Sequence, residues 1–580
     1  MMTLNNKIMK SLFYPSLLLS FLIYGCGPGT NMLEYEQIQV NEGIFVNQVG
    51  FCPQHVKHAV VPSNMSAFSI RNASTGKLVL SGESSEPAYW EFSGDTVAII
   101  DFSTLTEPGV YFITDKNETF RSHTFQIAEN IFEDVAKASL KAFYFNRTYM
   151  PIEETYGGKW SRPGGHPDTV VYIHESAASE NRKEGDIISS PYGWYDAGDY
   201  NKYIVNSGIS TWALLSFYEA FPENAASIEI NIPESGNDIP DLLDEALFNL
   251  KWVITMQDED GGVYHKLTNK EFGDFEMPHE ATAPRYVVQK TTAATLDFAA
   301  MMAQSARIYR KYLPDFANSC LEASRKAIEW AKLNPGVIYN QPADIHTGAY
   351  GDDKVLDEFV WAGLEMYITT HDPKYLEDID IHDLVVDMPQ WADVNSLGII
   401  SLALHEESLS DQSKIAQQLV IRFADELQEK YENSPFKVSL DFFRWGSNSD
   451  VALQGIFKLL AYRFTEDEKY LNSAIGDLDY ILGKNPTGYS YVTGFGHKSP
   501  LFIHHRPSGA DGIDEPVPGF LAGGPNLAAL LDCGPNVERS QYPAKSFVDL
   551  ECSYSTNEIA INWNAPLFYL AAGINQLCNE

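Results

Sequence analysis

Near residue 129 the pattern of apolar residues changes from the period of β-strands to the period of α-helices. Before that point, short apolar runs alternate with Asn, Gly, Ser and Pro at intervals of about ten residues, which is typical of short strands and turns. After it, apolar residues recur at helical spacing over stretches of roughly 12 to 24 residues. We therefore expect two domains, and the 580 residues exceed the size at which one core usually stops growing.

Residues 43–129 predict a small all-β sandwich of immunoglobulin-like size. Residues 130–580 predict a mainly α domain of about a dozen helices, and the absence of a fixed sequence period disfavours a ligand-binding solenoid. Three long loops rich in Gly, Pro and aromatic residues interrupt the helices, and loops of this length are usually functional. The expected strands contain residues 59–61, 67–70, 77–80, 97–100 and 109–113, the expected helices are 131–149, 204–221, 239–256, 291–312, 316–333, 355–369, 415–431, 450–464, 468–482 and 556–574, and the long loops are 151–203, 258–290 and 484–550.

The first 25 residues predict an export signal. Lys7 and Lys10 precede an apolar run at 12–24 that is too short for a membrane-spanning helix. The run ends at Gly25-Cys26 and resembles the lipobox of bacterial lipoproteins, in which the cysteine is lipidated. We therefore expect a lipoprotein of the bacterial cell envelope, in the outer membrane or periplasm, with a linker at 26–42. The alternative is a plain secretory signal that is cleaved nearby.

Composition excludes some partners. The net charge of −37 repels phosphate backbones, so nucleic acid is not expected, whereas a neutral polymer is compatible with such a surface. The alternative is that the acidic net charge serves only to keep the protein soluble. Cys26 apart, five cysteines stand without CxxC spacing, so we expect neither a disulfide scaffold nor a zinc site made by cysteines.

The first segment whose residues are suited to catalysis contains Asp196 and Asp199, three residues apart among glycines and aromatic residues. If the segment forms one helical turn, both carboxylates project to one side, and one of them can take a proton from a water held between them. The alternative is an acidic N-terminal cap of a helix.

The second segment contains Asp549, Tyr554 and Glu558. A glutamate packed against Tyr554 would have a raised pKa and could donate a proton. The alternative is a capping box, in which Ser555 and Glu558 open the helix at 556–574.

The third segment runs from 490 to 506 and ends in His504, His505 and Arg506. It lacks the carboxylates and the spacing of a metal site, so binding of sugar hydroxyls is the preferred interpretation, and a solvated basic loop is the alternative.

In their order and spacing, these segments closely resemble glycoside hydrolase family 9. The family's Asp-Ala-Gly-Asp motif followed by Tyr and Asn is matched at 196–201, and its histidine signature is matched at 490–506, which places the signature histidine at His504. The resemblance extends from about residue 131 to the end, and 45–51 resembles the opening of an immunoglobulin-like module that precedes the catalytic domain in one branch of the family. The family's acid signature is matched at Phe547, Asp549, Tyr554, Glu558, Asn564 and Ala565.

The resemblance implies an (α/α)6 barrel with an open cleft and inversion at the anomeric carbon. It assigns Asp199 as the general base, Asp196 as a residue that helps to hold the water, and Glu558 as the general acid. His504 and Asp549 would support the site. An inverting enzyme needs its two carboxyls about 6.5–9.5 Å apart, so that a water fits beyond the sugar ring.

The resemblance also suggests a structural calcium ion. Residues 347–358 are similar to a calcium-binding loop of the family, with Asp352, Asp357 and Glu358 as candidate ligands, and carboxylate oxygens suit calcium. The alternative is an acidic start of the following helix. The reaction itself needs no cofactor.

The preferred function is an inverting endo-β-1,4-glucanase acting on cellulose, mixed-linkage glucan or xyloglucan. Trp445 and Tyr554 are candidate residues for stacking on sugar rings, although Trp445 suits core packing equally well. One alternative is an exo-acting β-glucosidase or glucosaminidase, and another is a non-catalytic glycan-binding lipoprotein. We expect a monomer that contacts the membrane only through its N-terminal lipid.

Overall fold

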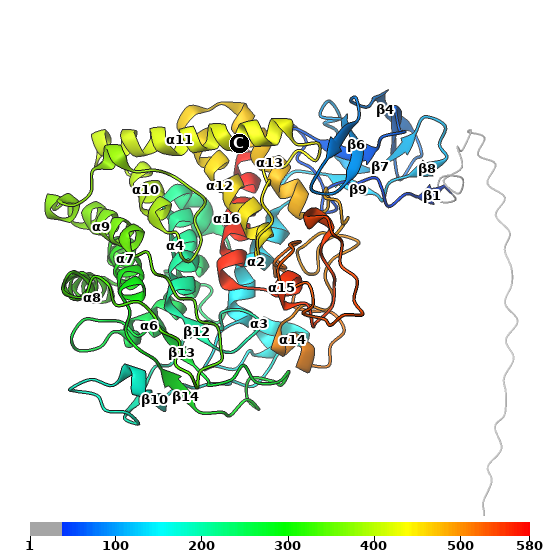
Figure 1. Cartoon of the computed structure of the whole chain (residues 1–580). Helices are drawn as coiled ribbons and strands as arrows, with labels where there is room; N and C mark the ends of the chain where they lie inside the picture. Colours follow the sequence, from blue (N-terminus) through cyan, green and yellow to red (C-terminus); the bar gives the residue numbers. More distant parts are fainter. Residues whose placement is uncertain (1–37, 580) are drawn as a thin grey trace, which may run out of the picture.

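The computed structural model describes residues 38–579, in which a β-sandwich precedes a helical domain (Figure 1). The predicted signal segment, the predicted lipidation site Cys26 and most of the predicted linker lie outside these residues. Within 38–579, none of the helices combines the length and the apolar character needed to cross a membrane.

The sandwich consists of two antiparallel-rich sheets that enclose a separate hydrophobic core around Phe68, Ile70, Ile100 and Ile113. Its strands are β1 (Gln39–Val40), β2 (His58–Pro62), β3 (Ala67–Asn72), β4 (Leu78–Glu83), β5 (Ala88–Trp90), β6 (Asp95–Asp101), β7 (Gly109–Asp115), β8 (Phe120–Arg121) and β9 (Phe125–Ile127). One sheet has the order β1-β8-β7-β3-β4, with β9 also paired to β7, and the other has the order β2-β6-β5. Every expected strand overlaps one of these strands.

The helices of the second domain form two layers. The inner layer consists of α4 (Ile204–Ala220), α7 (Thr292–Ile308), α9 (Leu356–Thr370), α10 (Asn395–Ala403), α12 (Ser447–Thr465) and α16 (Ile561–Leu577). The outer layer contains α2 (Glu133–Phe145), α6 (Asp241–Val253), α8 (Pro314–Leu333), α11 (Ser410–Asn433) and α13 (Glu468–Ile481). Inner helices such as α4, α10 and α16 are buried on nearly every face, whereas outer helices such as α8 and α11 bury one stripe.

The helices close a ring around the centre of the domain. α16 contacts α4, α4 contacts α7, and the contacts continue through α9 to α10. The outer helix α11 contacts both α10 and α12, and α12 contacts α16. This arrangement is an (α/α)6 barrel, and the predicted fold class is confirmed. The sequence patterns missed α10, because this short helix is apolar on all faces and shows no helical period.

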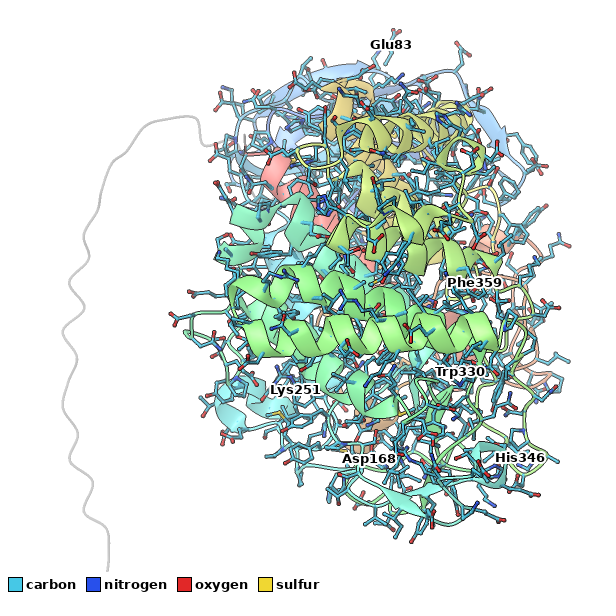
Figure 2. All side chains as sticks on the ribbon, turned by 90° about the vertical axis from the view of Figure 1, so that its left-hand side faces the viewer. Glu83, Asp168, Lys251, Trp330, His346 and Phe359 are labelled. Atoms are coloured by element: carbon cyan, nitrogen blue, oxygen red, sulfur yellow. A yellow bond between two sulfur atoms is a disulfide. The ribbon has the colours of Figure 1, made fainter. Side chains whose placement is uncertain are left out.

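Two of the long loops, 151–203 and 258–290, build a small sheet at one end of the barrel. Its strands are β10 (Val171–Ile173), β11 (Ile187–Ile188), β12 (Lys202–Tyr203), β13 (Lys266–Thr268) and β14 (Arg285–Val287), in the order β11-β10-β14-β13-β12. Figure 2 shows Asp168 and His346 at this end, opposite Glu83 of the sandwich. The buried Asp168 pairs with Lys202 at 2.7 Å and with Arg285 at 3.2 Å, which ties β12 to β14.

The sandwich packs directly against the barrel. Trp90 of β5 belongs to the core of the barrel, with its ring centroid 4.8 Å from that of Phe436. Asn47 donates from Nδ2 to Asp479 of α13 at 2.8 Å.

Two disulfides correct the expectation drawn from the cysteines. Cys52 pairs with Cys578 and joins the sandwich to the C-terminal helix, and Cys533 pairs with Cys552 within a long loop. Cys320 is a buried free thiol. The sequence did not predict these two disulfides, because the spacing of cysteines along the chain does not show which of them meet in space.

Candidate active site

One cavity of about 910 Å³ lies at the loop end of the barrel. It contains Asp196, Asp199 and Glu558 on its wall, so the structure brings together carboxylates that are more than 350 residues apart in sequence. The complete lining is Asp196, Ala197, Asp199, Tyr203, Phe272, Gly348, Ala349, Tyr350, Gln390, Trp391, Arg444, Trp445, His504, Arg506, Tyr554, Glu558 and Asn562.

Asp199 lies on a bend that leads into β12. Its Oδ2 accepts hydrogen bonds from Asn201 Nδ2 at 2.6 Å and from the hydroxyl of Tyr203 at 3.0 Å. Its buried Oδ1 has no hydrogen-bond partner among the described residues, although it borders the cavity. One oxygen is therefore held by the protein, and the other is available to accept from a water.

Asp196 is held more completely. Asn206 Nδ2 donates to both of its oxygens at 3.0 Å, and the hydroxyl of Tyr350 donates to Oδ2 at 3.1 Å. Burial and the nearby charge of Asp199 raise the pKa of the Asp196 carboxyl well above its ordinary value. Neither aspartate caps a helix, since α4 begins after Tyr203, so the cap alternative and the expected helical turn are both wrong.

Glu558 occupies an extended residue between α15 (Tyr554–Asn557) and α16. The expected helix start at 556 is wrong, and Glu558 does not form a capping box with Ser555, because α16 begins only at Ile561. The backbone N–H of Gly198 donates to Glu558 Oε1 at 3.3 Å. Burial, followed by the charges of Asp199 and Asp196, raises the pKa of Glu558 well above its ordinary value, which favours the protonated form that a proton donor needs.

Gly198 joins the three predicted segments, and sequence reasoning did not single it out. Its carbonyl accepts from Arg506 Nη1 at 2.8 Å and from the Arg506 backbone N–H at 3.1 Å. A Cβ at this position would stand 2.2 Å from the carbonyl oxygen of His504. Only glycine permits this close approach, which explains the glycine between the two aspartates.

The histidine segment contributes one ring to the cavity. His504 donates from Nδ1 to the carbonyl of Glu551 at 2.7 Å, which leaves Nε2 for the cavity side. His505 is buried, bonds to Ser508 and packs on Phe520, so the predicted contact of His505 with sugar is wrong. Successive side chains of an extended segment point in opposite directions, which explains why only one of the two histidines reaches the cavity.

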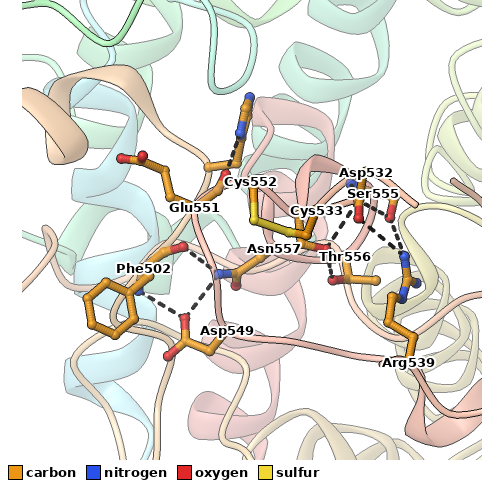
Figure 3. Close-up of a disulfide and its surroundings, with 12 residues drawn as sticks. Phe502, Asp532, Cys533, Arg539, Asp549, Glu551, Cys552, Ser555, Thr556 and Asn557 are labelled. Carbon is orange, nitrogen blue, oxygen red and sulfur yellow. Dashed lines mark hydrogen bonds and ion pairs between the residues drawn. A yellow bond between two sulfur atoms is a disulfide. The ribbon is translucent and has the colours of Figure 1, made fainter. Parts of the chain in front are cut away.

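Asp549 lies outside the cavity lining and acts through its neighbours. Its carboxylate accepts from the backbone N–H of Phe502 at 2.9 Å and from Asn557 Nδ2 at 3.0 Å (Figure 3). It also accepts from the backbone N–H of Leu501 at 2.9 Å. It thereby connects the segment that leads to His504 with the residue that precedes Glu558. This geometry suits a positioning residue.

Aromatic side chains form much of the wall. Trp445 and Tyr554 are 40% and 38% exposed, with ring centroids 5.6 Å apart, which favours stacking on sugar over core packing. Tyr350, Trp391 and Phe272 also line the cavity and were missed. Tyr350 lies within the predicted calcium loop, but an aromatic residue in a loop does not by itself predict a contact with substrate.

The predicted calcium ligands lie close to this wall and next to a further acid. Both carboxylate oxygens of Asp297 and of Glu358, and Oδ2 of Asp352, are buried without a hydrogen-bond partner among the described residues. Burial, Asp297 and Asp357 raise the pKa of Glu358 to about 12. Asp357 accepts from the backbone N–H of Val394 at 2.8 Å. Unpartnered buried carboxylate oxygens fit a hard divalent cation, and Asp297 joins the predicted donors.

The model of glycosyl hydrolase family 9 matches residues 132–571, and the model of the cellulase N-terminal Ig-like domain matches residues 39–119. The chain belongs to glycosyl hydrolase family 9. This family 9 chain is therefore a glycoside hydrolase with an N-terminal Ig-like domain, and the non-catalytic alternative does not hold.

Several relatives match nearly the whole chain. A xyloglucan-specific endo-β-1,4-glucanase of Bacteroides ovatus is 43% identical over 97% of both chains. Endoglucanase D of Acetivibrio thermocellus is 33% identical over 93% of this chain and 84% of its own. Among solved structures, a family 9 protein of Bacteroides ovatus superposes with a TM-score of 0.86 at 42% identity, covering 93% of this chain and 99% of that one. A thermostable endoglucanase of Alicyclobacillus acidocaldarius gives 0.83 at 30% identity, with 92% and 100% coverage.

Proposed function

We propose that this family 9 hydrolase is an inverting endo-β-1,4-glucanase whose substrate is xyloglucan. The observation that carries the catalytic part is the pairing, in one cavity, of Asp199 with a free buried oxygen and Glu558 with a strongly raised pKa. The first can accept a proton, and the second can donate one.

In the proposed reaction, Asp199 Oδ1 accepts a proton from a water while that water attacks the anomeric carbon. Glu558 donates its proton to the glycosidic oxygen as the bond to the leaving sugar breaks. Asp196 helps to orient the water, and Tyr350 and Asn206 hold Asp196 in place. Family resemblance supports this division of labour, with His504 and Asp549 as supporting residues.

The substrate proposal rests on the relative from Bacteroides ovatus and on a second cavity. This side cavity of about 190 Å³ shares Phe272 with the main cavity and is also lined by Tyr200, Tyr286 and Lys270. An aromatic side cavity of this size suits a monosaccharide branch on a glucan backbone, and unbranched glucans offer no such group.

A screen of the purified enzyme on xyloglucan, cellulose, mixed-linkage glucan and chitosan tests this function, with product lengths resolved over time. We expect the highest kcat/KM on xyloglucan and early products several sugars long. Single sugars as the first products would establish the exo-acting alternative, and a preference for chitosan would contradict the glucan assignment.

The side cavity has its own test. Phe272→Ala should lower kcat/KM several-fold on xyloglucan and less on mixed-linkage glucan, because only the branched substrate places a sugar there. Equal losses on both substrates would contradict the proposed use of the side cavity.

Calcium would stabilise the loop that carries Tyr350. The donors are Asp297, Asp352, Asp357 and Glu358, and the unpartnered oxygens of Asp297, Asp352 and Glu358 support the proposal. Removal of calcium by a chelator should lower the melting temperature, and added calcium should restore it. An unchanged transition would leave Asp352, Asp357 and Glu358 as an acidic start of α9 with no metal.

We also propose that the enzyme is an envelope lipoprotein with lipid on Cys26, and that it acts as a monomer. The signal-like sequence before Cys26 supports this location. Cys26→Ser should abolish palmitate labelling and release the enzyme from the membrane fraction of expressing cells. Unchanged labelling would contradict the assignment.

A further inference from the structure

Three side chains meet where the sandwich touches the barrel, and none of them lines the candidate active-site cavity. Glu42 follows β1, His123 follows β8, and His497 lies in the long loop that later carries His504. Among the described residues, they are the one group of three His, Cys, Asp or Glu side chains whose ligand atoms all lie within 4.8 Å of one another.

The contacts within this group are close. His123 Nε2 and Glu42 Oε1 are 3.0 Å apart, and the rings of His123 and His497 stack with their centroids 3.5 Å apart and an angle of 18° between their planes. Stacked imidazoles at this distance repel each other when both are protonated. A shared cation with lone pairs from both rings removes that repulsion.

Two imidazole nitrogens and one carboxylate oxygen are ligands that suit a divalent ion of borderline softness, such as zinc. Zinc accepts imidazole nitrogen and carboxylate oxygen at about 2.0–2.1 Å, so the donor atoms of a tetrahedral site lie roughly 3.3 Å apart. The side chain of Glu42 is 70% exposed and that of His123 is 31% exposed, so both can adjust to close the site. Three protein ligands leave the fourth position to a water, as this exposed place allows.

The neighbouring cation is directed elsewhere. Lys498 donates from Nζ to the carbonyl of Thr487 at 2.9 Å, and its ammonium lies 4.3 Å from the centre of the Tyr489 ring. Its backbone N–H donates to Gln48 Oε1 at 3.0 Å. These bonds hold the backbone next to His497 against the sandwich, and the ammonium of Lys498 makes its hydrogen bond and its ring contact outside the group.

We propose that Glu42, His123 and His497 bind one zinc-class divalent ion that connects the Ig-like domain to the loop leading to the active site. In the metal-bound form, the ion occupies the position of the proton shared by His123 Nε2 and Glu42, and the His123 ring carries its proton on Nδ1. The ion adds a link to an interface that Asn47, Gln48 and the Cys52–Cys578 disulfide already hold. The proposal does not depend on the substrate.

The test uses the untagged full chain, stripped of metal and then kept in excess calcium to saturate the acidic cluster near α9. Titration with ZnCl2 in a calorimeter should show one zinc per chain, and zinc should raise the melting temperature. Co²⁺ in place of zinc should give the visible absorption bands of a tetrahedral site.

Single substitutions identify the ligands. His123→Ala and His497→Ala should each weaken zinc binding at least tenfold and remove the cobalt bands, and Glu42→Gln should weaken binding less. The matched control is His382→Ala, which removes an exposed imidazole from the connection between α9 and α10, outside this group, and should bind zinc as the unchanged protein does. Unchanged zinc binding by His497→Ala, or no binding by the unchanged protein, would overturn the proposal.

Discussion

At the scale of single residues, the two proposed catalytic carboxyls differ in what surrounds them. Asp199 receives hydrogen bonds from Asn201 and Tyr203 and keeps one oxygen without a protein partner among the described residues. Glu558 receives one weak bond from Gly198 and lies near two negative charges. Two carboxyls in environments this different can serve as base and acid in one site.

A change of charge at Asp196 tests the origin of the raised pKa of Glu558. Glu558 must be protonated to act, so activity falls as the pH rises through its pKa. Ionised Asp196 raises this pKa, and the amide of Asp196→Asn cannot ionise, so the alkaline limb of the kcat/KM profile should move to lower pH. The shift should be about one pH unit, which corresponds to ~1.4 kcal/mol of lost repulsion.

Tyr203→Phe is the matched control for that profile. It removes a hydrogen bond to Asp199 without a change of charge near Glu558. The alkaline limb of the Tyr203→Phe profile should stay in place, although the kcat/KM of this variant falls. An alkaline limb unmoved by Asp196→Asn would mean that Asp196 does not set the pKa of Glu558.

The sequence motifs identified the residues that meet, but not how each side chain is directed. Asp196, Asp199, His504 and Glu558 all line the cavity, as the match of three motifs predicted. His505 does not, because the direction of a side chain follows from the extended backbone beneath it.

At the scale of elements, the helical period predicted nearly all helices of the barrel but misplaced the start of the last one. Residues 556–574 carry the apolar pattern of a helix, and Ser555 with Glu558 has the spacing of a capping box. In the structure, Glu558 pairs with His504 and Ile559 with Ala522 as isolated bridges, which keeps the chain extended there. These partners come from a distant segment, so local pattern could not predict them.

The Cys533–Cys552 disulfide holds this same region. It closes a loop whose Asp532 accepts hydrogen bonds from the backbone N–H and the hydroxyl of Ser555 (Figure 3). Cys533→Ser with Cys552→Ser should cost about 3 kcal/mol of loop-closure free energy. Because Tyr554 and Glu558 follow directly, we expect kcat/KM to fall on every substrate the enzyme accepts.

The other disulfide provides the comparison. Cys52→Ser with Cys578→Ser loosens the junction of the domains, far from the cavity, so the melting temperature should fall while kcat/KM below the transition stays unchanged. Equal activity of both double variants would show that the Cys533–Cys552 bond does not position the acid.

At the scale of the whole molecule, the sandwich and the barrel act as one body with a single active-site end. The change in the period of apolar residues near residue 129 indicated two domains, and the family resemblance predicted the barrel. Both periodicity and motif order are properties of the chain itself. The contacts between the domains were not predictable in this way. Asn47 meets Asp479 and Cys52 meets Cys578 only because the folded barrel brings its last helices to the sandwich.

The central claim is that Asp199 and Glu558 act on opposite faces of the sugar ring and invert the anomeric carbon. Proton NMR of the first products from a β-linked glucan tests it directly, before the new reducing ends equilibrate. The proposed arrangement predicts that the α-anomer forms first and the β-anomer appears later by mutarotation. A β-anomer as the first product would contradict it, because retention requires one of these carboxyls to act as a nucleophile.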